Sequence, residues 1–225
     1  MPPQPALLPT SVALRSHFDS FHFLSTLYFL LWATAAFSQS EALTLPRNLE
    51  QLVDESAVVL QGRVTSVSLA PHPQLNNLLT VVVTLQVEDA VKGNNFPTYT
   101  FRQAVIDKRD QQQLLGYRIG QHLLLALIRP SAYGLSSPAG LQQGRFSISS
   151  DASGKLQATN GFGNTGLLRG IDSQLRASGT QVNPQVRAML AESKPGPLPL
   201  NELKTLMRAV AARNVSQAAS RIVFP

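Results

Sequence analysis

The segment from Gly161 to Gly166 matches a known ligand-binding spacing, G-x-G-x-x-G. In dinucleotide-binding proteins this pattern follows a parallel strand and opens a full helix, and an acidic residue about twenty positions later binds the ribose. Here Gly170 interrupts the candidate helix, and the strand expected before the pattern is short. The sequence therefore predicts no dinucleotide partner and no cofactor.

Histidine can act as a general base or a metal ligand, and residues 39–225 contain two, His72 and His122. Neither has a second ligand at a short fixed spacing such as i, i+4, so no metal site is expected. A serine nucleophile is not marked by a G-x-S-x-G turn, although a dispersed Ser-His-Asp arrangement stays open. We expect His72 to lie in a proline-flanked turn and His122 to be a hydrogen-bonded residue at the edge of an apolar strand.

The chain has only thirteen Asp and Glu residues, so few carboxylates are available for the facing pair that acid–base catalysis of glycoside hydrolysis needs. The pairs at 88–89 and 107–110 are interpreted as surface charge. The chain has no cysteine, which excludes disulfides, thiolate metal sites and cysteine nucleophiles. We therefore expect a protein with no catalytic residues, and a hydrolase with dispersed residues, using His122 as its base, is the alternative.

An uncharged apolar run occupies residues 23–37 and ends in small residues (FLSTLYFLLWATAAF). This layout is typical of an export signal with cleavage after Ala35 or Ser38, although only Arg15 and Asp19 carry charge before the run. Fifteen residues fall short of the ~20 that span a bilayer. We predict a signal peptide at 1–38 and a secreted or periplasmic protein without an integral span, the alternatives being an uncleaved anchor and a buried helix.

The region after the signal changes from one helix to a series of strands. Asn48 and Gln51 have the spacing of a capping box, which predicts a helix over 48–55. Gly62, inside the first strand, indicates a bend or a close approach of two backbones, as in small coiled barrels. The apolar run 123–128 predicts a central strand covered on both faces. Strands are predicted at 58–69, 80–88, 99–103, 123–128, 144–148 and 155–159.

The C-terminal third has a different composition. Residues 161–198 are predicted to be a Gly/Pro-rich loop and linker, with a short helix at 184–190 and a stiff extended linker at 194–199. Residues 199–225 are predicted to be an amphipathic helix and tail, because one face of a helix to about residue 212 carries Leu203, Leu206, Met207 and Val210. That face either docks on the domain or binds a partner or a membrane surface.

Three segments together resemble the netrin-like or TIMP-like module. They contain LQGRV at 60–64, VEDAVKG at 87–93 and GQHLLLAL at 120–127, and the later GRF at 144–146 is similar to the end of the barrel in secreted bacterial relatives. The resemblance covers residues 48–149. It implies a mainly β fold, an OB-like antiparallel barrel of five to six strands over residues 39–160, with an N-terminal and a C-terminal helix.

The chain departs from the TIMP-like pattern at the N-terminal residue that those inhibitors use for inhibition. Those inhibitors chelate a protease zinc with a disulfide-fixed N-terminal cysteine, and this chain has none. The resemblance therefore implies a fold and not that mechanism. The expected function is that of an exported, non-catalytic interaction protein that engages another exported protein.

The net charge of +6 gives a second expectation, attraction to anionic surfaces or polymers. An OB-like barrel binds single-stranded nucleic acid with a basic groove and stacking aromatic side chains. Tyr99 and Phe101, beside Arg102, are the candidates, but we place them on opposite strand faces, where both cannot stack. The basic residues are scattered, which favours an ordinary solvated surface.

Overall fold

The computed structural model describes residues 45–222, with side chains as far as Asn214. The predicted signal peptide at 1–38 and its alternatives, an uncleaved anchor or a buried helix, lie outside the described residues. Within 45–222, no helix combines the length and apolar character needed to cross a bilayer.

A seven-stranded antiparallel sheet organises the fold, in the order β3-β2-β1-β4-β5-β6-β7. The prediction of a mainly β protein with a helix before and after the strands is confirmed. All six predicted strands form, and the seventh is a two-residue strand near the C-terminal helix. The strands are β1 Ser56–Pro71, β2 Leu79–Lys92, β3 Thr98–Ala104, β4 His122–Ile128, β5 Arg145–Ser150, β6 Leu156–Asn160 and β7 Leu198–Pro199.

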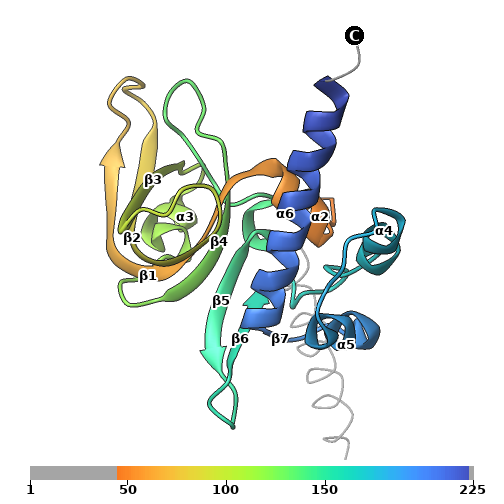
Figure 1. Cartoon of the computed structure of the whole chain (residues 1–225). Helices are drawn as coiled ribbons and strands as arrows, with labels where there is room; N and C mark the ends of the chain where they lie inside the picture. The colour runs from red at the N-terminus through yellow and green to blue at the C-terminus, as the bar shows by residue number, and fades with distance from the viewer. Residues whose placement is uncertain (1–44, 223–225) are drawn as a thin grey trace, which may run out of the picture. The chain divides into compact units, whose positions relative to one another are not determined.

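The first four strands form a Greek key, because β4 returns to pair with β1 on the side opposite β2. β1 is long enough to pair with both neighbours, and Figure 1 shows β1 to β4 curling around a common interior. Gly62 permits this arrangement, since a Cβ there would lie 2.3 Å from the Gln86 carbonyl oxygen. The close approach predicted from the sequence is confirmed.

Residues 135–138 run back between the two outer strands of this Greek key. Leu135 forms a parallel bridge to Arg102 on β3, and Pro138 forms an antiparallel bridge to Leu127 on β4. The backbone N–H of Ser136 donates to the Arg102 carbonyl at 2.8 Å. β3 and β4 are therefore linked at one point by a segment outside the named strands.

Five α-helices surround the sheet in the described residues. α2 (Leu49–Glu55) begins at the predicted Asn48–Gln51 capping box. α5 (Pro184–Glu192) begins after Asn183, as predicted, whereas α3 (Lys108–Gln112) and α4 (Ile171–Ala177) were not predicted. α6 (Leu200–Ile222) docks on the domain, because its predicted apolar face is fully buried.

Two hydrophobic cores lie on the two faces of β4. Leu123, Leu125 and Leu127 face the interior of the Greek key, together with Phe101 and Tyr117. Leu124 and Ala126 face the second core, which α2, β5, β6 and α4 to α6 complete. The prediction that β4 is central and covered on both faces is confirmed. We call β1–β4 with residues 105–139 the Greek-key lobe, and α2 with residues 140–214 the helical lobe.

The segment 194–199, predicted to be a linker, is extended but attached. The Gly196 N–H donates to the Gly163 carbonyl at 2.7 Å, and the Asn164 side chain donates to the Gly196 carbonyl at 2.8 Å. Leu198 pairs with Ala158 of β6 and is buried. The segment is therefore an edge of the sheet and not a tether, because turn carbonyls and N–H groups at 163–164 bind its backbone.

Candidate functional site

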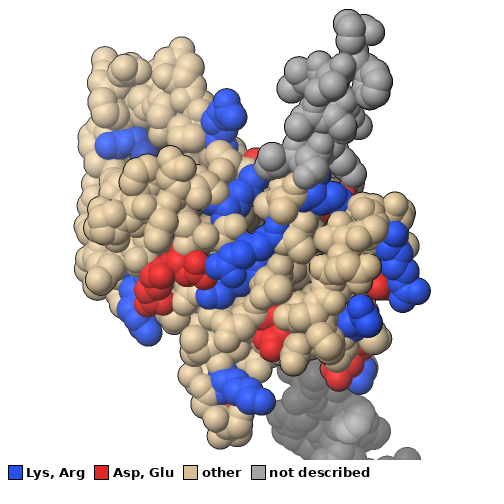
Figure 2. All heavy atoms as spheres, in the orientation of Figure 1, with Lys and Arg blue, Asp and Glu red and all other residues tan. Residues whose placement is uncertain are grey.

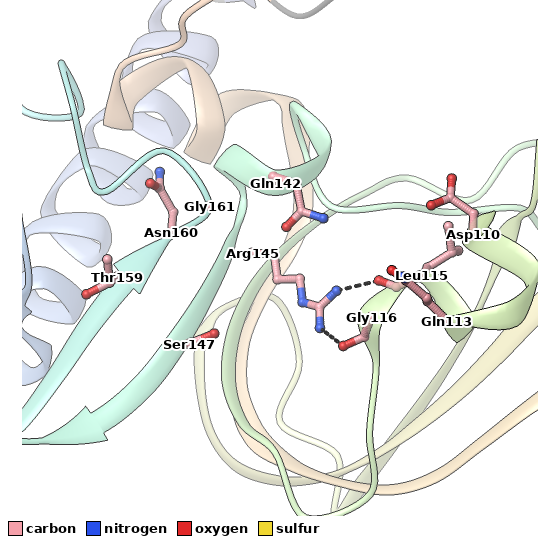
Figure 3. A pocket seen from close by; sticks show the side chains of 10 residues that line it. All are labelled: Asp110, Gln113, Leu115, Gly116, Gln142, Arg145, Ser147, Thr159, Asn160 and Gly161. Atoms are coloured by element: carbon pink, nitrogen blue, oxygen red, sulfur yellow. Dashed lines mark hydrogen bonds between the residues drawn. The ribbon is translucent and has the colours of Figure 1, made fainter. Parts of the chain in front are cut away.

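A polar cleft of about 300 Å³ lies where the two lobes meet, and we call it the junction cleft. Figure 3 shows β5 and β6 on one side and the segment after α3 on the other. Seven of the residues that line it have side chains with amide, hydroxyl, carboxylate or guanidinium groups. It is lined by Asp110, Gln113, Leu115, Gly116, Gln142, Arg145, Ser147, Thr159, Asn160 and Gly161.

Arg145, the first residue of β5, spans the cleft. Its Nη1 donates to the Leu115 carbonyl at 2.7 Å, and its Nη2 donates to the Gly116 carbonyl at 2.6 Å and to Gln121 Oε1 at 3.3 Å. The guanidinium carbon lies 3.9 Å from the centre of the Tyr117 ring, a cation–π contact. Burial lowers the pKa of Arg145, and burial raises the pKa of Tyr117 to about 12.

The carbonyls that Arg145 binds belong to an unusual turn. Leu114, Leu115 and Gly116 have φ angles of 49°, 54° and 74°, so three successive residues adopt the left-handed conformation. For each leucine this costs on the order of 1–2 kcal/mol. Such strain persists only when the surroundings fix it, and it gathers at binding and catalytic sites. Arg145 fixes this turn by binding two of its carbonyls.

The opposite wall is shaped by the contact of Gly161 with Gln142. The Gly161 N–H donates to the Gln142 carbonyl at 3.0 Å, and a Cβ on Gly161 would lie 2.7 Å from the Gln142 Cβ. The Gln142 side chain is exposed and points toward Arg145 (Figure 3). Asn160 points away from the cleft, because its side chain donates to the Gln143 carbonyl and accepts from two backbone N–H groups. Gln142 and, across the cleft, the exposed Gln113 are therefore the amides available to a ligand.

Asp110, on α3, is the one carboxylate that lines the cleft. Burial raises its pKa, the nearby Asp107 raises it further, and Arg109 opposes both. In the described residues no ion pair joins Asp110 or Arg145 to any partner. The cleft therefore carries one positive and one negative group, each without a salt bridge. Burial makes the charged form of each group less stable than it would be in water.

A second hollow, of about 430 Å³, lies at α4 and α5. Its Asp172 and Arg176 pair with each other at 2.7 Å. No strained backbone of the kind found at residues 114–116 borders it in the described residues. The junction cleft is the stronger candidate because strain and unpaired charge coincide there.

The two histidines weighed in the sequence lie outside the cleft. His72 is buried in the turn predicted for it, where Nδ1 accepts from the backbone N–H groups of Gln74 and Leu75, so Nε2–H donates to the Tyr133 carbonyl at 2.8 Å. His122 begins β4, and its Nε2 lies 2.7 Å from Glu88 Oε2. Glu88 also accepts from Gln61 at 2.8 Å. The histidines organise a turn and a strand end, and neither borders the cleft.

The other candidates are also committed elsewhere. Tyr99 and Phe101 lie two residues apart on one strand face and both contact the Greek-key core, so their placement on opposite faces was wrong. Their shared inward face leaves no exposed stacking pair. The glycines at 161–166 form turns after β6, and Gly163 and Gly166 have positive φ angles. No cluster of three metal-ligating side chains occurs in residues 45–214.

Lys and Arg side chains are scattered over the face seen in Figure 2, with acidic groups among them. One mixed cluster joins α6 to the Greek-key lobe, where Lys204 and Arg208 both donate to Asp89 at 2.7 Å. Lys204 also donates to Gln61 at 2.6 Å. The basic residues of this face are thus partly neutralised by structural ion pairs.

Sequence reasoning missed the site that the fold assembles. The sequence marks Arg145 only as part of GRF and as one of the scattered basic residues, and no pattern marks residues 114–116. The contact between Arg145 and the turn joins positions about thirty residues apart, so no local sequence pattern predicts it. No protein-family model, curated protein or solved structure matches the chain.

Proposed function

We propose that the protein is an exported, non-catalytic binding protein whose ligand occupies the junction cleft. The single observation that carries the proposal is the strained left-handed turn at 114–116. This turn borders the cleft, and hydrogen bonds from Arg145 to two of its carbonyls fix its conformation. Strained residues other than glycine are enriched at binding and catalytic sites. The side chains around it offer hydrogen bonds and charge to a ligand.

The geometry supports binding over catalysis for a chemical reason. A dispersed hydrolase would need a base within hydrogen-bond reach of its nucleophile. Ser147 and Thr159 line the cleft, yet neither described histidine does, since His72 and His122 bind the Tyr133 carbonyl and Glu88. Asp110 lines it too, but in the described residues no hydrogen bond joins its carboxylate to either hydroxyl. The cleft is near the lower end of the volumes at which small-molecule sites are found, which favours a small polar ligand.

The Greek-key lobe supports an OB-like, netrin-like interpretation of the domain. An OB fold is a partly open, five-stranded Greek-key barrel. Residues 135–138, bridged to β3 on one side and β4 on the other, are our candidate for the fifth strand. The export signal that the sequence predicts at 1–38 favours a secreted or periplasmic location, where another exported protein would supply or receive the ligand.

Nuclear magnetic resonance titration of the full chain tests the function. The probes are acetate, glycine, glycerol and glucose, each added to 20 mM at constant ionic strength. We expect at least one probe to shift the backbone signals of Gly116 and Gly161 saturably. Gln142→Ala should lower the affinity of the protein for that probe. Saturable shifts confined to regions outside the cleft, or none from any probe, would overturn the assignment of the site.

A further inference from the structure

We propose that the junction cleft binds a small monocarboxylate through the Arg145 guanidinium, an inference that rests on the proposed function and names its ligand class. Arg145 has unused N–H donors and no counter-charge, and a negative group, Asp110, lies on the far wall of the cleft.

The guanidinium has donors left for a ligand. An arginine carries five N–H groups, and the described residues accept three hydrogen bonds from Arg145. Two of these go to carbonyls on the turn, and one goes to Gln121. Because Nη2 donates both of its hydrogens, two N–H groups remain, one on Nε and one on Nη1, and each can donate a charge-assisted hydrogen bond to a carboxylate oxygen.

The positive charge of Arg145 has dipoles around it but no carboxylate. Carbonyl oxygens on one side and the Tyr117 ring face on the other orient the group without neutralising it. Charges removed from water are normally paired or bound to an ion. A carboxylate entering the cleft would be the first formal counter-charge that Arg145 meets, and Gln142 and Ser147 lie on the same wall to bind its substituent.

Asp110 decides which anion is accepted. It lines the same cleft, so a second negative charge on the ligand is repelled. One charge satisfies Arg145, whereas inorganic phosphate or a dicarboxylate brings more negative charge than the cleft can compensate. The cavity of about 300 Å³ limits the ligand to a small molecule. The ligand class is therefore a compact monocarboxylate with hydrogen-bonding substituents.

The test compares three probes on the full chain by the same titration, with the Arg145 Nε–H signal added as a readout. Glycolate is the monocarboxylate, glycolamide is its neutral analogue of similar shape, and inorganic phosphate is the anion of higher charge. We expect glycolate to bind at least tenfold more tightly than glycolamide or phosphate, and to shift the Arg145 Nε–H signal. Asp110→Asn should improve phosphate binding several-fold.

Variants separate recognition from folding. Arg145→Gln should lower glycolate affinity at least tenfold, and Arg145→Lys should lower it less, since the charge stays although the planar guanidinium and its extra N–H donors are lost. Arg118→Gln, which removes one exposed positive charge just after the same turn, is the matched control and should bind glycolate normally. If Arg145→Gln unfolds, Arg145→Lys and Gln142→Ala still test the site.

The two proposals fail differently. Glycolamide binding in the cleft as tightly as glycolate would overturn the carboxylate inference and leave the cleft as a binding site. Phosphate binding more tightly than glycolate to the unmodified chain would overturn the role of Asp110 and the monocarboxylate class. If no probe of either set moves Gly116, Gly161 or the Arg145 Nε–H, the cleft is not a binding site and both proposals fall.

Discussion

The two lobes bury their cores in different ways. The Greek-key core is built from one continuous stretch of chain, between Val64 and Leu127. The helical-lobe core collects residues from both ends of the described chain, from Leu49 on α2 to Val210 on α6. The first core forms between strands that are neighbours in the sequence. The second forms only when distant segments of the chain meet, which costs more loop-closure entropy.

β4 is the wall that the two cores share. Its alternate side chains point into different cores, and it pairs with β1 on one edge and β5 on the other. Ion pairs from α6 to Asp89 add a second connection between the lobes. The lobes therefore differ in how they assemble but are expected to unfold together.

The largest expected effect comes from adjacent leucines on this shared strand. Leu124→Ala opens a cavity in the helical-lobe core, and Leu125→Ala opens one in the Greek-key core, since both side chains are fully buried. Each should lower the free energy of unfolding by about 2–5 kcal/mol. Urea denaturation followed by circular dichroism and by tyrosine fluorescence should give one coincident transition for each variant.

Leu45→Ala is the matched control, because Leu45 is 84% exposed. It should change the free energy of unfolding by less than about 0.5 kcal/mol. Two separate transitions in either core variant would show that the lobes unfold independently, and the view of β4 as a coupling strand would then be wrong.

A smaller effect is expected from a substitution that acts on the Greek-key lobe alone. In Gly62→Ala the new Cβ would collide with the backbone of Gln86, and backbone atoms cannot move aside as a flexible side chain can. We expect a loss of about 1–3 kcal/mol. Amide hydrogen exchange should accelerate first along β1 and β2, while the helical lobe stays protected up to global unfolding.

Ser68→Ala, at an exposed position of the same strand, should leave both stability and exchange nearly unchanged. Unaltered stability in Gly62→Ala would mean that β1 and β2 can separate at this point without cost. The close approach would then not be the reason that glycine stands there.

The sequence predicted the helices and strands that have a local signal and missed those that lack one. Strands with clear alternation and the Asn48 capping box are local signals, and they predicted β1 to β6, α2 and α6 correctly. α3 and α4 were missed because helices of five and seven residues hold too few turns to show an apolar periodicity. The attachment of residues 194–199 was missed because its partners, Gly163 and Asn164, lie in a distant turn.

The candidate site was beyond sequence reasoning for the same physical reason. The cleft exists because Arg145 on β5 meets the carbonyls of a left-handed turn on the other lobe. Leucine has no preference for positive φ, so residues 114 and 115 gave no signal of the turn that they form. Binding sites made from tertiary contacts of this kind become visible only once the lobes are placed together.

The smallest of these effects concerns the ion pairs between the lobes, and it depends on pH. Burial raises the pKa of Asp89, but hydrogen bonds and charge from Lys204 and Arg208 outweigh it, so the pKa lies below its ordinary value of 3.8. Asp89→Asn removes the charge, and since the carboxylate is partly exposed we expect a loss of about 1 kcal/mol at pH 7. Urea denaturation between pH 3 and pH 7 measures it.

A carboxylate whose pKa is lowered by folding binds protons more readily in the unfolded chain. Its contribution is therefore complete above the ordinary pKa and is lost as the pH falls through the lower, folded value. The stability difference between the unmodified chain and Asp89→Asn should be constant from pH 5 to 7 and shrink below about pH 4. Asp172→Asn, in the exposed pair with Arg176, should cost less than about 0.5 kcal/mol. If Asp89→Asn costs no more than this control, the ion pairs from α6 do not couple the lobes.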